Sequence, residues 1–143
     1  MQRTASARWH GGAQDGSGTL TTQSGTLKDV PFTFKARFGD GKGTNPEELI
    51  AVAHAGCFSM ALSFALGNAG FKPEAIDTQA ALTLDKVDSG FAITAVHLTT
   101  RAKVAGIDAA RFAEIANGAK AGCPVSKALG GVPEITLKAT LRR

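Results

Sequence analysis

The hydrophobic pattern of the chain is dominated by one long segment without formal charge. Between Leu49 and Leu66 the only ionisable side chains are the neutral His54 and Cys57, and apolar residues occur around the whole helical circumference. Such a pattern predicts a helix that is buried on most sides. Because the segment also contains serine, glycine and many small alanines, a core helix explains it better than a membrane span.

Both ends of this segment are typical of helix termini. Thr44 or Asn45 can act as the N-cap, Pro46 suits the first turn, and the two glutamates that follow suit the positive end of the helix dipole. Residues 67–70, Gly-Asn-Ala-Gly, tolerate left-handed conformations and are expected to end the helix.

Alternating and β-branched positions predict strands on either side of this helix. Before it we expect strands over 3–12, 19–25 and 32–38, the last with Phe32, Phe34, Ala36 and Phe38 on one face. After it we expect a hairpin (76–87 and 91–104), an amphipathic helix (109–121), a short helix near Pro124 and a closing strand (134–141). The order βββ-α-ββ-α-α-β predicts an α+β fold with a largely antiparallel sheet, as one domain over residues 1–143.

Composition excludes several function classes. The net charge of +4 is spread along the chain with no run of three basic residues, which favours a solvated surface over nucleic-acid binding. The glycine-rich loop 39–43 lacks the spacing of a phosphate-binding loop. The first residues contain no apolar run of a signal peptide, so we expect a cytoplasmic location.

Two cysteines in such a chain are either inert core residues or a redox pair. Cys123 directly precedes Pro124 at an expected helix N-terminus, where N–H groups favour a thiolate. Cys57 lies in the middle of the long helix, where apolar surroundings raise the pKa of a thiol. The local sequence therefore predicts that Cys123 is the more acidic thiol, unless a cation reaches Cys57.

The residues near Cys57 offer little direct help. His54 could pair with Cys57 three residues later, but a core or interface histidine explains it better. Glu47 and Glu48 precede Cys57 by ten and nine residues, about 14–15 Å along a helix, so neither reaches the sulfur from its own position. Two cysteines and three histidines without a close-spaced pair argue against a metal site.

Two cysteine motifs carry a resemblance to a known family. The first begins with Arg37-Phe38, continues with Gly41-Lys42-Gly43-Thr44-Asn45-Pro46-Glu47-Glu48-Leu49 and ends with His54-Ala55-Gly56-Cys57-Phe58-Ser59-Met60-Ala61-Leu62-Ser63. The second is Ala119-Lys120-Ala121-Gly122-Cys123-Pro124-Val125-Ser126. Together with residues 85–94, they resemble the osmotically inducible protein C (OsmC) branch of the OsmC/Ohr peroxidase family over nearly the whole chain. The resemblance implies an OsmC-like intertwined homodimer around the central helix.

The same resemblance implies a thiol-dependent peroxidase in oxidative and osmotic stress defence, acting on organic hydroperoxides and less efficiently on hydrogen peroxide. By position, Cys57 is then the peroxidatic cysteine and Cys123 the resolving one, while Arg37 stabilises the Cys57 thiolate and Glu47 pairs with Arg37. This reverses the local ranking of the thiols, because Arg37 supplies the missing cation. No cofactor is implied, and an external dithiol, such as a lipoyl group on a protein, would reduce the disulfide.

The residues alone leave other function classes open. One is a non-enzymatic structural or ligand-binding dimer whose cysteines fill a core, and another is a cysteine hydrolase that uses His54. A homodimer is predicted because the central helix is apolar all round and because Glu47 cannot reach Cys57 along its own helix. Whether Arg37 and Glu47 act within their own chain or from the partner subunit stays open.

Overall fold

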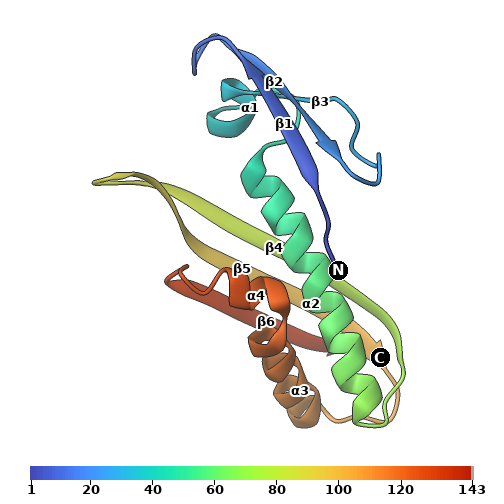
Figure 1. The fold of residues 1–143 in the computed structure, drawn as a ribbon. Coiled ribbons are helices and arrows are strands. Elements are labelled where there is room, and N and C mark those ends of the chain that lie inside the picture. The colour runs from blue at the N-terminus through green and yellow to red at the C-terminus, as the bar shows by residue number, and fades with distance from the viewer. Residues whose placement is uncertain (143) are drawn as a thin grey trace. The chain divides into compact units, whose positions relative to one another are not determined.

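A computed structural model describes residues 1–142 of the chain (Figure 1). The chain divides into two compact units, residues 1–49 and 50–143, and each contains a three-stranded sheet. A single domain over residues 1–143 stays a prediction. The elements are β1 (Ala5–His10), β2 (Ser17–Thr22), β3 (Val30–Thr33), α1 (Phe34–Phe38), α2 (Pro46–Asn68), β4 (Pro73–Val87), β5 (Gly90–Val104), α3 (Ala109–Gly122), α4 (Pro124–Ala128) and β6 (Glu134–Arg142).

The sheet of the first unit is a purely antiparallel β1-β2-β3 meander. Gly18 of β2 pairs with Phe32 of β3 and with Trp9 of β1, and the two rings lie 5.1 Å apart between centroids. A Cβ atom on Gly18 would lie 2.5 Å from the Phe32 ring and 2.8 Å from the Trp9 ring. Glycine at this position therefore lets the two aromatic side chains pack across the strand.

The predicted third strand, residues 32–38, is wrong in its second half. Strand β3 ends at Thr33 and the next five residues form the helix α1, so the element order gains one helix. The Thr33 hydroxyl accepts a hydrogen bond from the Ala36 N–H at 3.1 Å and so caps this helix. The spacing of Phe34 and Phe38 is consistent with a strand and with a helix, because residues four apart lie on the same face of either element. Their ring centroids lie 4.8 Å apart.

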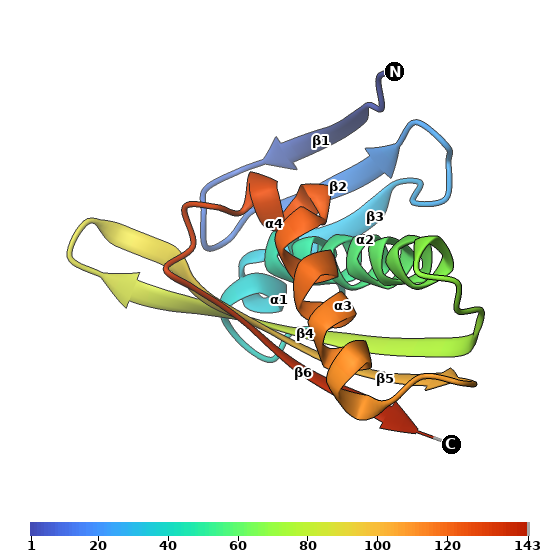
Figure 2. The same ribbon diagram turned by 90° about the horizontal axis from the view of Figure 1, so that it is seen from below.

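The sheet of the second unit has the order β4-β5-β6, with β4 antiparallel and β6 parallel to β5. The prediction of a largely antiparallel sheet in an α+β fold is confirmed, with β6 as the parallel exception. Helix α3 and the part of α2 within this unit cover one face of the sheet (Figure 2). From Val96 onward every second residue of β5 is buried on the core side: Val96, Leu98, Thr100, Ala102 and Val104.

Helix α2 begins as the sequence predicts. Asn45 is its N-cap: the Asn45 Oδ1 atom accepts a hydrogen bond from the Glu48 N–H at 2.8 Å, and the Asn45 carbonyl accepts from the Leu49 N–H at 3.1 Å. The Thr44 hydroxyl donates to the Glu48 carboxylate at 2.8 Å instead. Glu48 therefore acts in the structure of the helix terminus.

Within the single chain, α2 is not buried on most sides, which corrects that prediction. Its buried residues follow one another at a spacing of four: His54, Phe58, Leu62 and Leu66. Val52, Met60 and Phe64 are 65%, 65% and 68% exposed. By length and composition α2 is the one helix among residues 1–142 that could cross a membrane, but its buried face packs into the core with β5 and α3.

Candidate active site

The two cysteines meet in the second unit although 66 residues separate them. Cys57 lies in the middle of α2, and Cys123 lies at the junction of α3 and α4, where its N–H donates to the Ala119 carbonyl at 2.9 Å and Pro124 begins α4. The two sulfur atoms lie 2.9 Å apart as a hydrogen-bonded pair of free thiols. A disulfide needs about 2.05 Å, so only a small movement separates the two sulfur atoms from bonding distance once one of them is oxidised.

The surroundings of the two thiols differ. Burial raises the pKa of the Cys57 thiol and the Cys123 side chain raises it further, while a hydrogen bond from the Val125 N–H opposes the shift. Burial also opposes ionisation of Cys123. There, however, the neighbouring Cys57 thiol, the N–H and hydroxyl of Ser126 and the Val125 N–H favour the thiolate, outweigh burial and lower the pKa of Cys123. These neighbours make Cys123 the more acidic thiol, as the local sequence predicts.

A buried histidine adjoins the thiol pair. The His54 ring is fully buried, and its Nε2 atom lies 2.7 Å from the hydroxyl oxygen of Ser126. Its Nδ1 atom has no hydrogen-bond partner among residues 1–142. Burial lowers the pKa of His54, so the ring is neutral at neutral pH.

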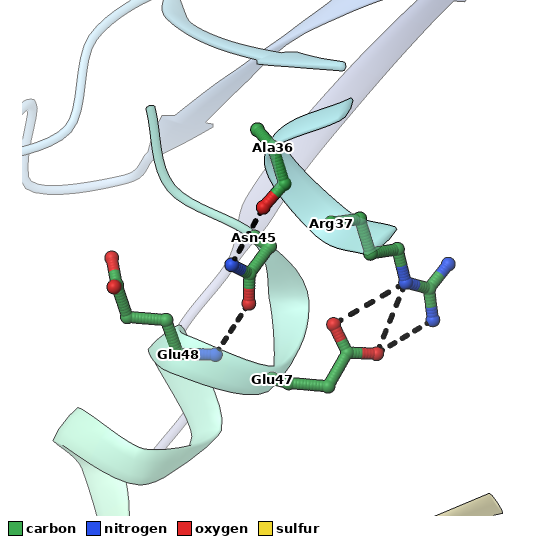
Figure 3. A network of polar contacts seen from close by, with 5 residues as sticks. All are labelled: Ala36, Arg37, Asn45, Glu47 and Glu48. Atoms are coloured by element: carbon green, nitrogen blue, oxygen red, sulfur yellow. Dashed lines mark hydrogen bonds and ion pairs between the residues drawn. The ribbon is translucent and has the colours of Figure 1, made fainter. Parts of the chain in front are cut away.

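An ion pair forms in the first unit between α1 and the first turn of α2 (Figure 3). The Arg37 Nη2 atom lies 2.7 Å and the Arg37 Nε atom 3.0 Å from the Glu47 Oε1 atom, so the guanidinium donates twice to one carboxylate. Asn45 fixes the two elements together, because its Nδ2 atom donates to the Ala36 carbonyl at 3.0 Å. The cap of α2 thus also positions the pair.

Beside this ion pair is an aromatic cavity. It has a volume of about 270 Å³, and Arg37 forms part of its wall. The Arg37 Cζ atom lies 5.1 Å from the centroid of the Phe38 ring, a distance at which a cation is attracted by an aromatic face. The other lining residues are mostly apolar: Trp9, Ala13, Phe32, Thr33 and Phe34.

The four residues that the sequence predicts for the site occur in the structure as two contacts, Cys57 with Cys123 and Arg37 with Glu47. Their catalytic roles stay predictions. Sequence reasoning missed Ser126 and the aromatic wall that includes Trp9. Ser126 lies in the second cysteine motif, three residues after Cys123, and this spacing could have indicated that it lies near the thiol. No sequence pattern indicated the aromatic wall, because α1 replaces half of the strand that the alternating residues predicted.

Comparison with known proteins decides the family. The model of the family described as "OsmC-like protein" matches residues 39–138. The chain belongs to the OsmC family. This OsmC-family chain is 53% identical over 142 residues to "Peroxiredoxin OsmC" of Escherichia coli (strain K12), covering 99% of this chain and 98% of that protein.

More distant members of the OsmC family agree. The chain is 32% identical to "Organic hydroperoxide resistance protein OhrB" of Bacillus subtilis (strain 168), over 85% of this chain and 88% of that one. The crystal structure of OhrB of Bacillus subtilis superposes with a TM-score of 0.68 at 28% identity, covering 97% of this chain and 98% of that chain. The resemblance to the OsmC/Ohr family is therefore confirmed, and this OsmC-family chain is a cysteine-based peroxidase.

Proposed function

We propose that this peroxidase reduces organic hydroperoxides, and hydrogen peroxide less efficiently, through a sulfenic acid on Cys57 and a Cys57–Cys123 disulfide. The observation that supports this most strongly is the 2.9 Å distance between the two free thiols. A role in hydroperoxide defence follows from its peroxiredoxin and hydroperoxide-resistance relatives. We also propose a role in defence against osmotic stress.

The proposed reaction uses the two cysteines, the peroxide and an external dithiol, and needs no cofactor. The Cys57 thiolate attacks one peroxide oxygen, the O–O bond breaks, and the alkoxide leaves and takes a proton to become an alcohol. The Cys123 thiolate then attacks the Cys57 sulfenic sulfur, an S–S bond forms, and hydroxide leaves. An external dithiol, for which a lipoylated protein is our candidate, reduces the disulfide by exchange and is itself oxidised. A cytoplasmic location, where dithiol reductants are maintained, stays a prediction.

A cation is needed for the first step because burial raises the pKa of the Cys57 thiol. We assign this role to the Arg37 guanidinium, which the Glu47 carboxylate holds in a fixed orientation. An opposite charge within about 4–6 Å favours the thiolate and lowers the pKa of a thiol. The proposal leaves open which subunit supplies Arg37 to each Cys57.

A homodimer is part of the proposal. Val52, Met60 and Phe64 are large apolar side chains that α2 leaves about two-thirds exposed in a single chain. Covering such a surface with a second copy would bury apolar area in an obligate interface. Arg37 and Glu47 of one subunit could then serve Cys57 of the other.

The aromatic cavity beside Arg37 supports a preference for organic substrates, because its wall can bury an alkyl or aryl group while the guanidinium binds the peroxide oxygens. We expect Phe34→Ala to lower kcat/KM for cumene hydroperoxide about tenfold, the usual effect of losing one large apolar contact, and to leave kcat/KM for hydrogen peroxide unchanged. The measurement is a steady-state series of both peroxides with a dithiol reductant.

Phe91→Ala is the matched control, because Phe91 lies on β5 of the other unit and is 57% exposed. It should leave both constants unchanged. An equal fall for both peroxides in Phe34→Ala, in a protein with native circular dichroism, would show that the cavity does not select the substrate.

The hydrolase alternative receives no support from the geometry. The Nε2 atom of His54 makes its hydrogen bond with the Ser126 hydroxyl and not with Cys57. A histidine that activates a nucleophile must lie within hydrogen-bond reach of it. His54 is therefore available for a different role.

A further inference from the structure

The buried histidine next to the thiol pair has no role in the chemistry described so far. His54 is fully buried on α2, and Ser126 on α4 is 8% exposed. A neutral imidazole in an apolar core is unusual unless its polar atoms are used. One of its nitrogens is used, and the partner is the Ser126 hydroxyl, which lies three residues after Cys123 in the short helix α4 and favours the Cys123 thiolate.

The unpaired Nδ1 atom fixes the direction of these hydrogen bonds. If Nδ1 carried the ring proton, a buried N–H group would have no acceptor among residues 1–142, and orphaned N–H groups are rarer in proteins than orphaned acceptors. The proton therefore belongs on Nε2, which donates to the Ser126 oxygen. The Ser126 hydroxyl hydrogen is then free to point at the Cys123 sulfur.

We propose that His54 and Ser126 form a hydrogen-bonded relay, from Nε2–H to the hydroxyl and from the hydroxyl to the Cys123 sulfur. Once Cys57 is a sulfenic acid, the relay holds Cys123 as a thiolate aimed at Cys57. Both act through Cys123, so they are positioning residues. The relay controls the rate of disulfide formation and is not required for peroxide reduction. This inference rests on the proposed function, because it assumes that Cys123 attacks a sulfenic acid on Cys57.

The local electrostatics agree with this role. Within residues 50–142, the ionisable group that acts on each sulfur is the other sulfur. Cys123 must therefore be stabilised as a thiolate by neutral donors, which are the hydroxyl and N–H of Ser126, the Val125 N–H and the Cys57 thiol. When Cys57 is a sulfenic acid its thiol no longer donates, so the relay carries a larger share in the step that needs the Cys123 thiolate.

The test separates the two chemical steps. Reduced protein is mixed with one equivalent of cumene hydroperoxide without a dithiol, and samples are quenched with a thiol-blocking reagent at successive times. Alcohol release measures the first step, and the loss of blockable thiols on Cys123, read by mass spectrometry, measures disulfide formation. The variants are Ser126→Ala, Ser126→Thr and His54→Leu.

We expect Ser126→Ala and His54→Leu to slow disulfide formation at neutral pH by about 5- to 10-fold, without slowing alcohol release. Losing a hydrogen bond to a charged group lowers the thiolate fraction strongly, and the higher nucleophilicity of a more basic thiolate offsets part of that loss. Raising the pH should restore the rate, since it restores the thiolate. Ser126→Thr keeps the hydroxyl and should stay near the parent rate.

Thr100→Val is the matched control, because Thr100 also carries a buried hydroxyl group, hydrogen bonded to Thr78 at 2.9 Å. It should change neither step. Unchanged disulfide formation in Ser126→Ala, or slowing that no rise in pH relieves, would overturn the relay. Ser126→Ala removes one oxygen atom and carries the test even if His54→Leu does not fold. Failure of the proposed function would be visible separately, as an absence of alcohol release in the parent protein.

Discussion

Cys57→Ser should abolish peroxide consumption, while Cys123→Ser should consume about one equivalent of organic hydroperoxide per chain and then stall. The first change removes the sulfur that attacks the peroxide, and no other group in the proposed scheme replaces it. The second leaves that sulfur in place but removes the thiol 2.9 Å away that would convert the sulfenic acid to a disulfide. Peroxide consumption without and with excess dithiol distinguishes the two variants.

Over-oxidation is the expected fate of the Cys123→Ser protein, because an unresolved sulfenic acid reacts with further peroxide to give sulfinic acid. Intact-mass measurement after a large excess of peroxide checks this. A Cys57→Ser protein with full activity would contradict the assignment of the peroxidatic cysteine. The circular dichroism of both variants should match that of the parent chain, since serine differs from cysteine by one atom.

Arg37→Ala should lower kcat/KM for organic hydroperoxides by about 100-fold, since an opposite charge close to an ionisable group shifts its pKa by about 1–3 units. The pKa of Cys57, read from the pH dependence of thiol alkylation in a Cys123→Ser background, should rise correspondingly. Stability should change by less than about 1 kcal/mol, because the Arg37 side chain is 40% exposed. Arg37→Lys keeps the charge but loses the double donation to Glu47, and should recover only part of the activity.

Mixed dimers locate the subunit that supplies Arg37. Arg37→Ala subunits combined with Cys57→Ser subunits should recover activity if the guanidinium comes from the partner, since one site of each heterodimer is then intact. No recovery in proven heterodimers would place Arg37 in the same chain as the cysteine it serves. A chain that is monomeric at micromolar concentration would contradict the dimer altogether.

Much of the fold follows from local sequence signals. Helices α2 and α3 begin where the sequence predicts them, and in the structure Asn45 and Asp108 are their side-chain N-caps. The pattern failed at residues 34–38, because phenylalanines at alternate positions also occur four apart. It also failed for the exposure of α2: an apolar circumference predicts burial, but it cannot tell whether this chain or a second copy provides the covering surface.

The site was predictable to a different degree at each residue. The local sequence ranks Cys123 as the more acidic thiol, and the lowered pKa of this thiol beside Ser126 and Val125 agrees. The opposite ranking, with Cys57 as the attacking thiol, came only from resemblance to a family. The pairing of His54 with Ser126 joins residues 72 positions apart, and no periodicity of the chain predicts such a contact.

The central claim is that peroxide oxygen is transferred to Cys57 first, even though its own neighbours make it the less acidic thiol. The most direct measurement treats Cys57→Ser and Cys123→Ser with one equivalent of cumene hydroperoxide in the presence of dimedone, which traps sulfenic acids. The modified peptide is then mapped by mass spectrometry. The account predicts rapid labelling of Cys57 in Cys123→Ser and no comparable labelling of Cys123 in Cys57→Ser. Equal or faster labelling of Cys123 would contradict it.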